Sequence, residues 1–202
     1  REDLEESNFS GSIIAEIPVF DLEENEKLFL DPSDRSIVSE SFRMLMSNTR
    51  YLLNQKSKTP TILVTSSIKG EGKTLTALNL SLAFASLDKK VLLIGCDLRN
   101  PQIHRYLNEE KNQKGLVNFL VDNTLKWSEW TLNKFKKFPN HAILLCGSIP
   151  PNPLSLINNG NLDLLLEDAK KEYEYIIIDT APTLLVADTK SIIPLVDTTV
   201  YL

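Results

Sequence analysis

The sequence predicts an α/β protein in which helices cover both faces of a mostly parallel sheet. Two observations lead to this prediction. Short runs that are apolar at nearly every position, and rich in β-branched residues, recur along the chain, and segments with helical periodicity separate them. A strand that is apolar on both faces has to be covered on both, and the alternation of strands with helices is typical of a parallel sheet.

The expected strands are spaced widely enough to leave room for helices between them. They cover residues 61–65, 91–96, 142–146, 175–179 and 198–202. The last of them resembles a strand that has been cut short. Because a parallel strand normally leads into a further crossover connection, we expect the natural chain to continue beyond Leu202.

Three segments are expected to be helical. The segment 36–53 follows turn-forming residues at 31–34, and the segment 74–87 follows a glycine-rich loop. A third helix should begin at Asp188 as its N-cap, and Pro194 should kink it or limit its length. The spacings of three and four in the first helix predict a buried face made of Phe42, Leu45, Thr49 and Leu52.

Residues 1–30 are expected to form a linker with one extended apolar run at 13–20, and residues 31–202 to form one domain. The acidic start does not resemble a signal peptide. The apolar runs fall short of the roughly 18 residues that a membrane-spanning helix needs, so we expect this part of the protein to be soluble. Cys96 and Cys146 lie in apolar runs without metal-ligand spacing, which indicates buried reduced thiols and a cytoplasmic compartment.

The charge composition argues against a nucleic-acid partner. The formal net charge is -5, and no large basic stripe is present. Residues 124–138 do interleave Trp127, Trp130 and Phe135 with lysines. Their spacings of three and five also fit a short helix that packs one face, and the acidic balance favours that interpretation.

The stretch TSSIKGEGKTLTALNL, from Thr65 to Leu80, has the close of a phosphate-binding loop. In such a loop backbone N–H groups surround an anion, and the next helix adds its positive end. The expected flanking strand and helix disfavour the alternative, a chance Gly-Lys-Thr in a surface loop. Ser67 stands at the first glycine's position, which is tolerable if that position does not need a positive φ. We expect a nucleotide to be held by Lys69, Gly70, Glu71, Gly72, Lys73, Thr74 and Leu75.

Two further strands end in a carboxylate that should lie near this loop. Asp179 closes an apolar strand, as an acid that holds Mg²⁺ would, although a simple strand-end acid is the alternative. Asp97 follows the strand after the loop's helix, where it can ligate Mg²⁺ or accept a proton from an attacking hydroxyl. Arg99 either neutralises developing charge, contacts a neighbouring subunit or is simply solvated. The candidate metal ligands are Thr74, Asp97 and Asp179, and the candidate catalytic residues are Lys73, Asp97, Arg99 and Asp179.

Together these motifs resemble those of a known family. TSSIKGEGKT, VLLIGCDLRNP and YIIIDTAP, with SIPPNP between them, are similar to motifs of the bacterial tyrosine kinases that control polysaccharide polymerisation and export. The similarity runs from about Ile13 to Leu202. It implies a P-loop NTPase-like fold with 31–202 as the kinase domain, ATP and Mg²⁺ as cofactors, and transfer of the γ-phosphate to protein tyrosines.

The resemblance also implies partners and a location. In that family the acceptor tyrosines lie in the tail of a neighbouring subunit, and a membrane-spanning activator region is on the same chain or a partner. A homo-oligomer at the cytoplasmic face of the inner membrane is therefore implied. A family pattern, E-x-x-R-x-x-R, mediates ring assembly. Here Glu40 and Arg43 match it, but Met46 stands where the second arginine belongs, so the resemblance does not extend to the full ring contact.

Two departures keep alternatives open. Asp97 matches the second acid of the family's D-x-D pattern, but Gly95 occupies the place of the first. A nucleotide-dependent assembly module with little phosphotransfer is therefore one alternative. The other is a partitioning or division-site ATPase, although these carry a lysine where this chain has Ile68, with Lys69 one place off. The tyrosines form no cluster, being Tyr51, Tyr106, Tyr173, Tyr175 and Tyr201.

Overall fold

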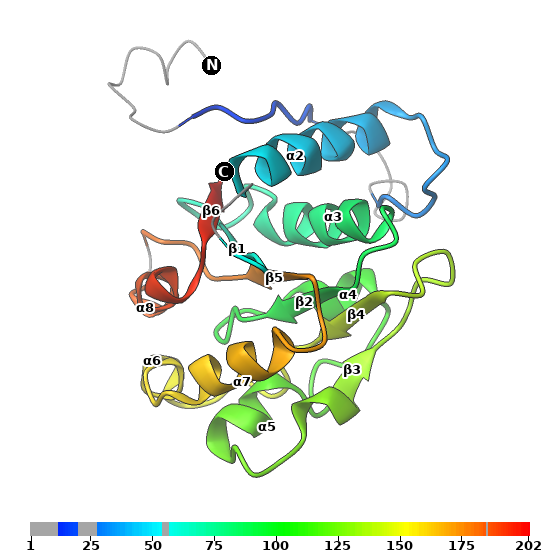
Figure 1. The fold of residues 1–202 in the computed structure, drawn as a ribbon. Helices are drawn as coiled ribbons and strands as arrows, with labels where there is room; N and C mark the ends of the chain where they lie inside the picture. Colours follow the sequence, from blue (N-terminus) through cyan, green and yellow to red (C-terminus); the bar gives the residue numbers. More distant parts are fainter. Residues whose placement is uncertain (1–11, 20–27, 54–56, 185) are drawn as a thin grey trace.

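The structure is a computed structural model that describes residues 12–19, 28–53, 57–184 and 186–202. Its centre is a six-stranded sheet with the order β3-β4-β2-β5-β1-β6 (Figure 1). β3 pairs antiparallel with β4, and the other pairings are parallel, so the predicted fold class is confirmed. The strands are β1 (Thr61–Thr65), β2 (Val91–Gly95), β3 (Thr131–Leu132), β4 (His141–Leu144), β5 (Tyr175–Asp179) and β6 (Thr198–Tyr201).

Helices cover both faces of this sheet (Figure 1). One face carries α2 (Ile37–Leu53), α3 (Lys73–Ala85) and the short α4 (Ile103–Tyr106). The other face carries α5 (Leu116–Val121), α6 (Pro153–Ile157), α7 (Asn161–Ala169) and α8 (Asp188–Ile192). A 3₁₀ helix, η3 (Ile193–Leu195), follows α8 and contains Pro194, which confirms that this proline limits the helix.

Side chains of the central strands alternate between two hydrophobic clusters, one on each face of the sheet. In β1, Ile62 and Val64 belong to the cluster that includes α2 and α3, while Leu63 belongs to the cluster that includes α5 and α7. Every residue of β1 and β2 is buried. These strands are therefore apolar throughout because they are covered twice. The predicted burial of Cys96 and Cys146 as free thiols is also confirmed.

All five predicted strands form, but β3 was not predicted. The region 124–138, expected to be a short helix, forms only a 3₁₀ helix, η2 (Trp127–Trp130), which runs directly into β3. A strand of two residues is too short to show an alternating pattern. The packing role of these aromatics is confirmed for Trp127, which is buried and whose indole N–H donates to Asp168 Oδ2 at 3.0 Å.

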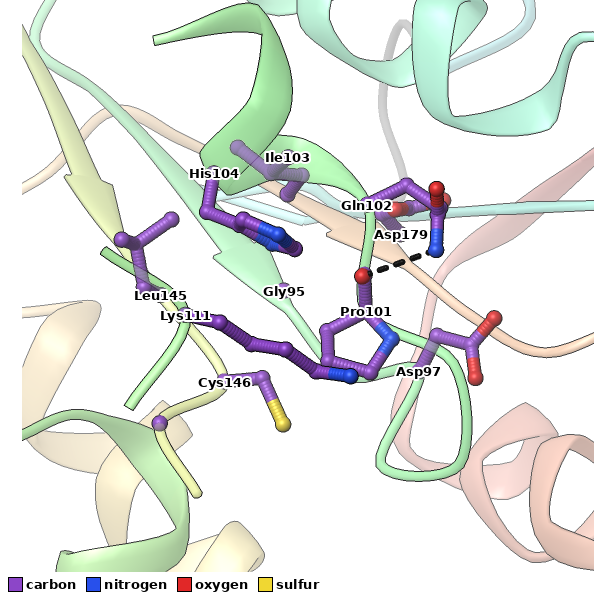
Figure 2. Close-up of a pocket in the computed structure, with 11 residues that line it drawn as sticks. Gly95, Asp97, Pro101, Gln102, Ile103, His104, Lys111, Leu145, Cys146 and Asp179 are labelled. Atoms are coloured by element: carbon purple, nitrogen blue, oxygen red, sulfur yellow. Dashed lines mark hydrogen bonds between the residues drawn. The ribbon is translucent and has the colours of Figure 1, made fainter. Parts of the chain in front are cut away.

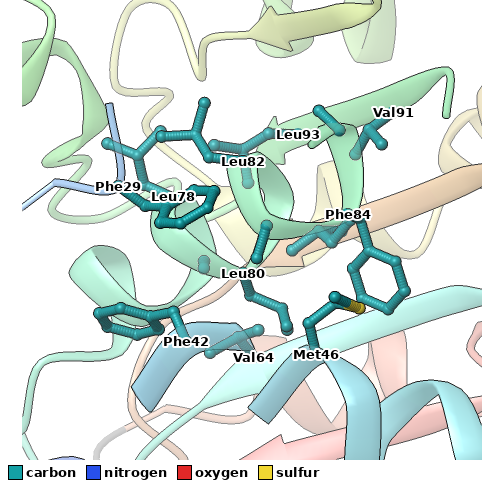
Figure 3. Close-up of a cluster of buried hydrophobic side chains, with 14 of the residues drawn as sticks. Phe29, Phe42, Met46, Val64, Leu78, Leu80, Leu82, Phe84, Val91 and Leu93 are labelled. Carbon is teal, nitrogen blue, oxygen red and sulfur yellow. The ribbon is translucent and has the colours of Figure 1, made fainter. Parts of the chain in front are cut away.

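Helix α2 packs onto α3 in the larger cluster (Figure 3). Its predicted buried face is confirmed for Phe42, Leu45 and Thr49. The prediction is wrong for Leu52, which is 44% exposed, whereas Leu53 is buried. Leu53 follows Thr49 by four residues, and the helical period of 3.6 brings it, rather than Leu52, back to the buried face of the helix. Met46 also points into the cluster, beside Phe84.

The predicted linker contributes to the core at its end. Phe29 is fully buried, and its backbone N–H donates to Asn79 Oδ1 at 2.6 Å. Most of the predicted extended run 13–20 is described and contains neither helix nor strand, while Phe20 lies outside the described residues. The domain boundary after residue 30 stays a prediction. In the ranges that the structure describes, no helix is both long and apolar enough to cross a bilayer.

Candidate active site

The phosphate loop joins β1 to α3. Gly72 is the N-cap of α3, and Gly70 and Gly72 have φ angles of 101° and 90°, in the left-handed region that favours glycine. Glu71 turns back onto the loop, since its Oε2 accepts a hydrogen bond from the N–H of Ile68 at 2.8 Å. The first backbone N–H groups of a helix have no partner within it, so the start of this 13-residue helix offers donors to a phosphate.

Ser67 takes the place of the loop's first glycine without strain. Among the described residues other than glycine, only Asp88 and Asn108 have positive φ. The backbone at Ser67 is therefore ordinary, and the condition for a tolerable serine is met. The hydroxyl of Ser67 lies 2.9 Å from that of Tyr201 on β6.

Lys73, Asp97 and Asp179 converge beside this loop from three different segments. Lys73 Nζ lies 3.4 Å from Asp97 Oδ2, and both side chains are buried. The other oxygen, Asp97 Oδ1, accepts hydrogen bonds from the N–H groups of Arg99 and Asn100 at 3.3 and 2.9 Å. This local turn fixes the orientation of the carboxylate. Asp179 is at the end of β5 and senses the charges of both Lys73 and Asp97.

Asp179 has a strongly perturbed pKa. Burial raises the pKa of this carboxyl to about 7, while the charge of Lys73 and a hydrogen bond from Thr74 act to lower it and the charge of Asp97 to raise it. Its Oδ1 has no hydrogen-bond partner among the described residues. A buried polar atom without a partner is costly, so this oxygen is suited to a cation bound from outside the chain.

The oxygen donors fit Mg²⁺ bound together with a phosphate chain. Thr74, Asp97 and Asp179 supply a hydroxyl and two carboxylates, which are hard ligands of the kind that Mg²⁺ prefers. Within the described part of the chain, no group of three or more His, Cys, Asp and Glu residues could hold a metal by itself. Mg²⁺ usually takes one or two carboxylates and completes its shell with water and substrate phosphates. The site thus has the donors of a P-loop fold that holds a nucleotide with Mg²⁺.

Arg99 has a partner that the sequence did not reveal. Its Nε and Nη2 donate to the two oxygens of Asp188 at 2.6 and 3.0 Å. The predicted N-cap role of Asp188 is wrong, because Ala187 is the N-cap of α8 and no side chain caps this helix. The carboxylate is turned toward Arg99 instead, and this bidentate pair ties the loop after β2 to α8. The catalytic role of Arg99 stays a prediction.

Gly95 is enclosed by its neighbours (Figure 2). A Cβ at this position would lie 3.2 Å from Ile103 Cδ1 and 3.3 Å from the backbone nitrogen of Cys146. Both approaches are tighter than most Cβ contacts, so a larger residue would require the Ile103 side chain and the backbone at Cys146 to give way by a few tenths of an ångström. Gly95 lies opposite Asp179 in the β2–β5 register. Gly95, which stands where the first acid would be, is therefore part of the packing between α4 and the sheet.

Two pockets adjoin the phosphate loop. The phosphate-loop pocket, of about 220 Å³, is lined by the predicted loop residues other than Glu71 and by Asn100, Gln102, Arg105 and Tyr106. The cation-lined pocket, of about 120 Å³, is lined by Lys69, Lys73 and Arg99 and by the apolar residues Ala181, Pro182 and Val186.

Sequence reasoning missed the residues of α4 and of the segment after β5, because they form no motif of their own. Their one signal was their position just after strands that end in an acid.

The assembly motif on α2 is engaged within the chain. Arg43 Nη1 lies 2.5 Å from Glu40 Oε1, Arg43 Nη2 donates to the carbonyl of Pro32 at 2.7 Å, and the guanidinium stacks on the ring of Phe29. Met46, at the place of the second arginine, is buried against α3.

Comparison with known proteins agrees with this geometry. A family profile described as AAA domain matches residues 59–196. Tyrosine-protein kinase YwqD from Bacillus subtilis (strain 168) is 34% identical over 157 residues, which are 77% of this chain and 64% of that protein, so the chain spans less than two thirds of this relative. The solved kinase domain of Escherichia coli tyrosine kinase ETK has a TM-score of 0.86 at 26% identity, covering 100% of this chain and 80% of that one.

A likeness to a division-site protein is weaker. The septum site-determining protein MinD from Pyrococcus horikoshii OT3 has a TM-score of 0.58 at 24% identity, over 71% of this chain and 57% of that one, and shares the fold alone. By its family profile, its sheet and its phosphate loop, the chain belongs to the AAA domain family, and YwqD and ETK, which it resembles over most of its length, are named bacterial tyrosine kinases.

Proposed function

We propose that the chain is the kinase domain of a protein-tyrosine kinase that transfers the γ-phosphate of ATP to protein tyrosines and regulates capsular or exopolysaccharide polymerisation and export. The observation that carries the proposal is the convergence of Lys73, Asp97 and Asp179 at a phosphate loop. The likeness to YwqD and to the ETK kinase domain supports it. Ile68, at the position of a partitioning ATPase's extra lysine, and the lower TM-score of MinD disfavour that alternative.

Each residue has a distinct task in this proposal. Lys73 binds the phosphates of ATP as a point charge, and Thr74 and Asp179 hold Mg²⁺, which when bound neutralises charge on the phosphates. Asp97 is the base that accepts the proton of the acceptor hydroxyl or a further ligand of Mg²⁺. Because backbone N–H groups occupy Asp97 Oδ1, the oxygen left for this role is Oδ2, beside Lys73.

The cation-lined pocket is the entrance that we propose for the acceptor tyrosine. It has apolar surface from Ala181, Pro182 and Val186, against which an aromatic ring can pack. Lys73 and Asp97 line the same pocket, so a hydroxyl at the end of the ring would reach the charged groups. Arg99 also lines it and, although paired with Asp188, keeps 45% of its side chain exposed.

The proposal includes the partners that the resemblance implies. These are acceptor tyrosines in the tail of a neighbouring subunit and a membrane-spanning activator region, on the same chain or a partner, at the cytoplasmic face of the inner membrane. We propose that the subunits associate without the family's ring contact, because Glu40 and Arg43 pair with each other and Met46 is buried.

The test is a phosphotransfer assay on this chain. We would incubate it with ATP, Mg²⁺ and a copolymer of glutamate and tyrosine, and detect phosphotyrosine by mass spectrometry. Lys73→Met should abolish the product and the binding of ATP measured by calorimetry, because the charge on the phosphates loses its partner. Lys171→Met is the matched control, since Lys171 is exposed in the turn after α7. ATP binding without any phosphotyrosine would overturn the kinase proposal.

The enclosure of Gly95 favours one second candidate, a nucleotide-dependent assembly module with little phosphotransfer. Gly95→Asp alone is a poor probe because its Cβ would meet Ile103 Cδ1 at 3.2 Å. The double variant Gly95→Asp/Ile103→Val removes that methyl group and relieves the tighter of the two contacts. A large rise in transfer rate would show that the native site lacks a base. The oligomeric mass is measured by light scattering with and without ATP. An increase with ATP, while no phosphotyrosine forms, would favour the assembly module.

A further inference from the structure

Three hydroxyl groups from distant parts of the sequence meet beside the phosphate loop. Tyr201 Oη lies 2.9 Å from Ser67 Oγ and 3.0 Å from Thr183 Oγ1. Thr183 Oγ1 in turn donates to the backbone carbonyl of Ser66 at 3.2 Å. We call Ser67, Thr183 and Tyr201 the hydroxyl cluster. It connects the loop, the segment after β5 and the end of β6.

The direction of each hydrogen bond in this cluster follows from the number of protons. A hydroxyl has one proton, and Thr183 donates its own to the carbonyl of Ser66. The oxygen of Thr183 therefore accepts the proton of Tyr201, and Tyr201 in turn accepts the proton of Ser67. The resulting chain runs from Ser67 through Tyr201 and Thr183 to Ser66. It begins and ends on two consecutive residues of the phosphate loop.

The cluster strengthens a contact between two segments that line the same pocket. Backbone bonds already join them, from Thr183 N to the carbonyl of Ser66 at 2.8 Å and from Leu184 N to that of Ser67 at 3.2 Å. The loop brings Lys69 and Lys73 to the cation-lined pocket, and the segment after β5 brings its apolar wall. The relative position of these segments therefore sets the shape of that pocket.

Tyr201 is well placed to hold this contact because its backbone belongs to the sheet. It lies opposite Thr65 in the parallel β1–β6 ladder, so its Cα is fixed relative to the residue from which the loop departs. Its side chain is 49% exposed, and burial of the ring therefore does not account for its position. The two hydroxyl contacts are what orient it.

We propose that Tyr201 is a positioning residue that holds the start of the phosphate loop in its nucleotide-binding shape. It acts through Ser67 and Thr183, and it does not line either of the two pockets beside the loop. The serine at the first-glycine position then has a use, since a glycine there would lack the hydroxyl that begins the chain. This inference rests on the proposed binding of ATP at the loop.

The test is the affinity of the chain for ATP with Mg²⁺, measured by calorimetry. Tyr201→Phe keeps the ring and removes both contacts, so affinity should fall about 3- to 10-fold, as expected for one or two hydrogen bonds of ordinary strength. Ser67→Ala should have a similar effect. The double variant should be little weaker than either single variant, because both interrupt the same chain of hydrogen bonds.

The matched control is Thr199→Val. Thr199 lies on the same face of β6, two residues earlier, is exposed, and its side chain makes no hydrogen bond within the described structure. Loss of the Thr199 hydroxyl should leave the affinity for ATP unchanged. Urea unfolding of Tyr201→Phe and Thr199→Val is compared in parallel, because a residue that served stability alone would lower the unfolding midpoint without changing the affinity.

The possible results separate this inference from the proposed function. If Tyr201→Phe binds ATP as the unchanged chain does, or if the losses multiply in the double variant, Tyr201 does not position the loop, and the kinase proposal is unaffected. If the unchanged chain binds no better than Lys73→Met, nucleotide binding itself fails and both proposals are overturned.

Discussion

Two ionisable side chains are buried at opposite edges of the same, mostly parallel sheet. His141 begins β4 and Asp179 ends β5. Burial lowers the pKa of His141 to about 3 and raises that of Asp179 to about 7, so each is moved toward its neutral form. Each also has one polar atom without a hydrogen-bond partner among the described residues, His141 Nδ1 and Asp179 Oδ1.

The difference between them lies in their surroundings. Burial is the sole cause of the shift in the pKa of His141, whose Nε2 lies 2.8 Å from Ser81 Oγ and whose ring packs near that of Phe135. Asp179 is surrounded by a cation, a second acid and a hydroxyl. Burial with a shifted pKa therefore indicates packing when the neighbours are neutral, and a functional site when charges of both signs converge.

The largest expected effect comes from Asp179→Asn. This change keeps the shape and removes the charge, so the affinity for ATP with Mg²⁺ should fall by about 100-fold or more, since even outer partners of metal ligands contribute about 10- to 100-fold. Calorimetry with and without Mg²⁺ measures the loss. Asp163→Asn, on the exposed side of α7, is the control. An unchanged affinity would remove Asp179 from the site.

The next effect concerns Gly95, which lies opposite Asp179 in the sheet. Gly95→Asp should lower the free energy of unfolding by about 1–3 kcal/mol, because the new Cβ crowds Ile103 and the backbone at Cys146. Addition of Ile103→Val should restore part of the lost free energy of unfolding. Urea unfolding measures both variants. A Gly95→Asp protein as stable as the unchanged chain would show that Ile103 moves aside at little cost in free energy.

A third effect is a pH dependence with opposite signs at the two residues. The folded pKa of Asp179 is about 7, above its usual value, so its contribution to stability falls as pH rises from about 4 to about 7. The folded pKa of His141 is about 3, below its usual value, so its contribution rises with pH from about 3 to about 6.5.

The same ionisation should control nucleotide binding. Because Asp179 has to lose its proton before it binds Mg²⁺, the affinity for ATP with Mg²⁺ should rise about tenfold between pH 6 and pH 8. Calorimetry at both pH values tests this, and the rise should disappear in Asp179→Asn. A rise that persists in that variant would assign the ionisation to another group.

The smallest effect is expected from His141→Leu. The free energy of unfolding at pH 7 should fall by about 1 kcal/mol, since Ser81 loses a partner but still donates to the carbonyl of Leu78 at 2.7 Å. The affinity for ATP should not change. A tenfold loss of affinity would contradict the assignment of His141 to packing and with it the comparison.

Much of the fold could be predicted because the central strands are covered twice. Continuous apolar runs such as 61–65 and 175–179 stand out against their surroundings, and the glycine loop between a strand and a helix has a pattern of its own. β3 could not be predicted, because its two residues are held by pairing with β4 rather than by a local pattern. Leu52 was misplaced because one residue of helical phase separates it from the buried Leu53.

The site residues could be predicted where they belong to a contiguous sequence motif. They could not be predicted where they depend on contacts between residues that are distant in the sequence. Lys73 and Asp179 could be named from strand-end positions. The pairing of Arg99 with Asp188 joins residues 89 positions apart, and an acid at the start of a helix has a simpler local explanation as a cap. Tyr201 likewise carried no signal, because its partners are known only once β6 lies beside β1.

The crowding around Gly95 also constrains how the chain can change over generations. An acid at this position is expected to be harmful while Ile103 keeps its outermost methyl group, and a smaller residue at 103 offers no benefit while 95 remains glycine. Introduction of the first acid therefore requires changes at two positions. The packing of Gly95 therefore couples positions 95 and 103, so an acid at 95 is expected to be tolerated best together with a smaller residue at 103.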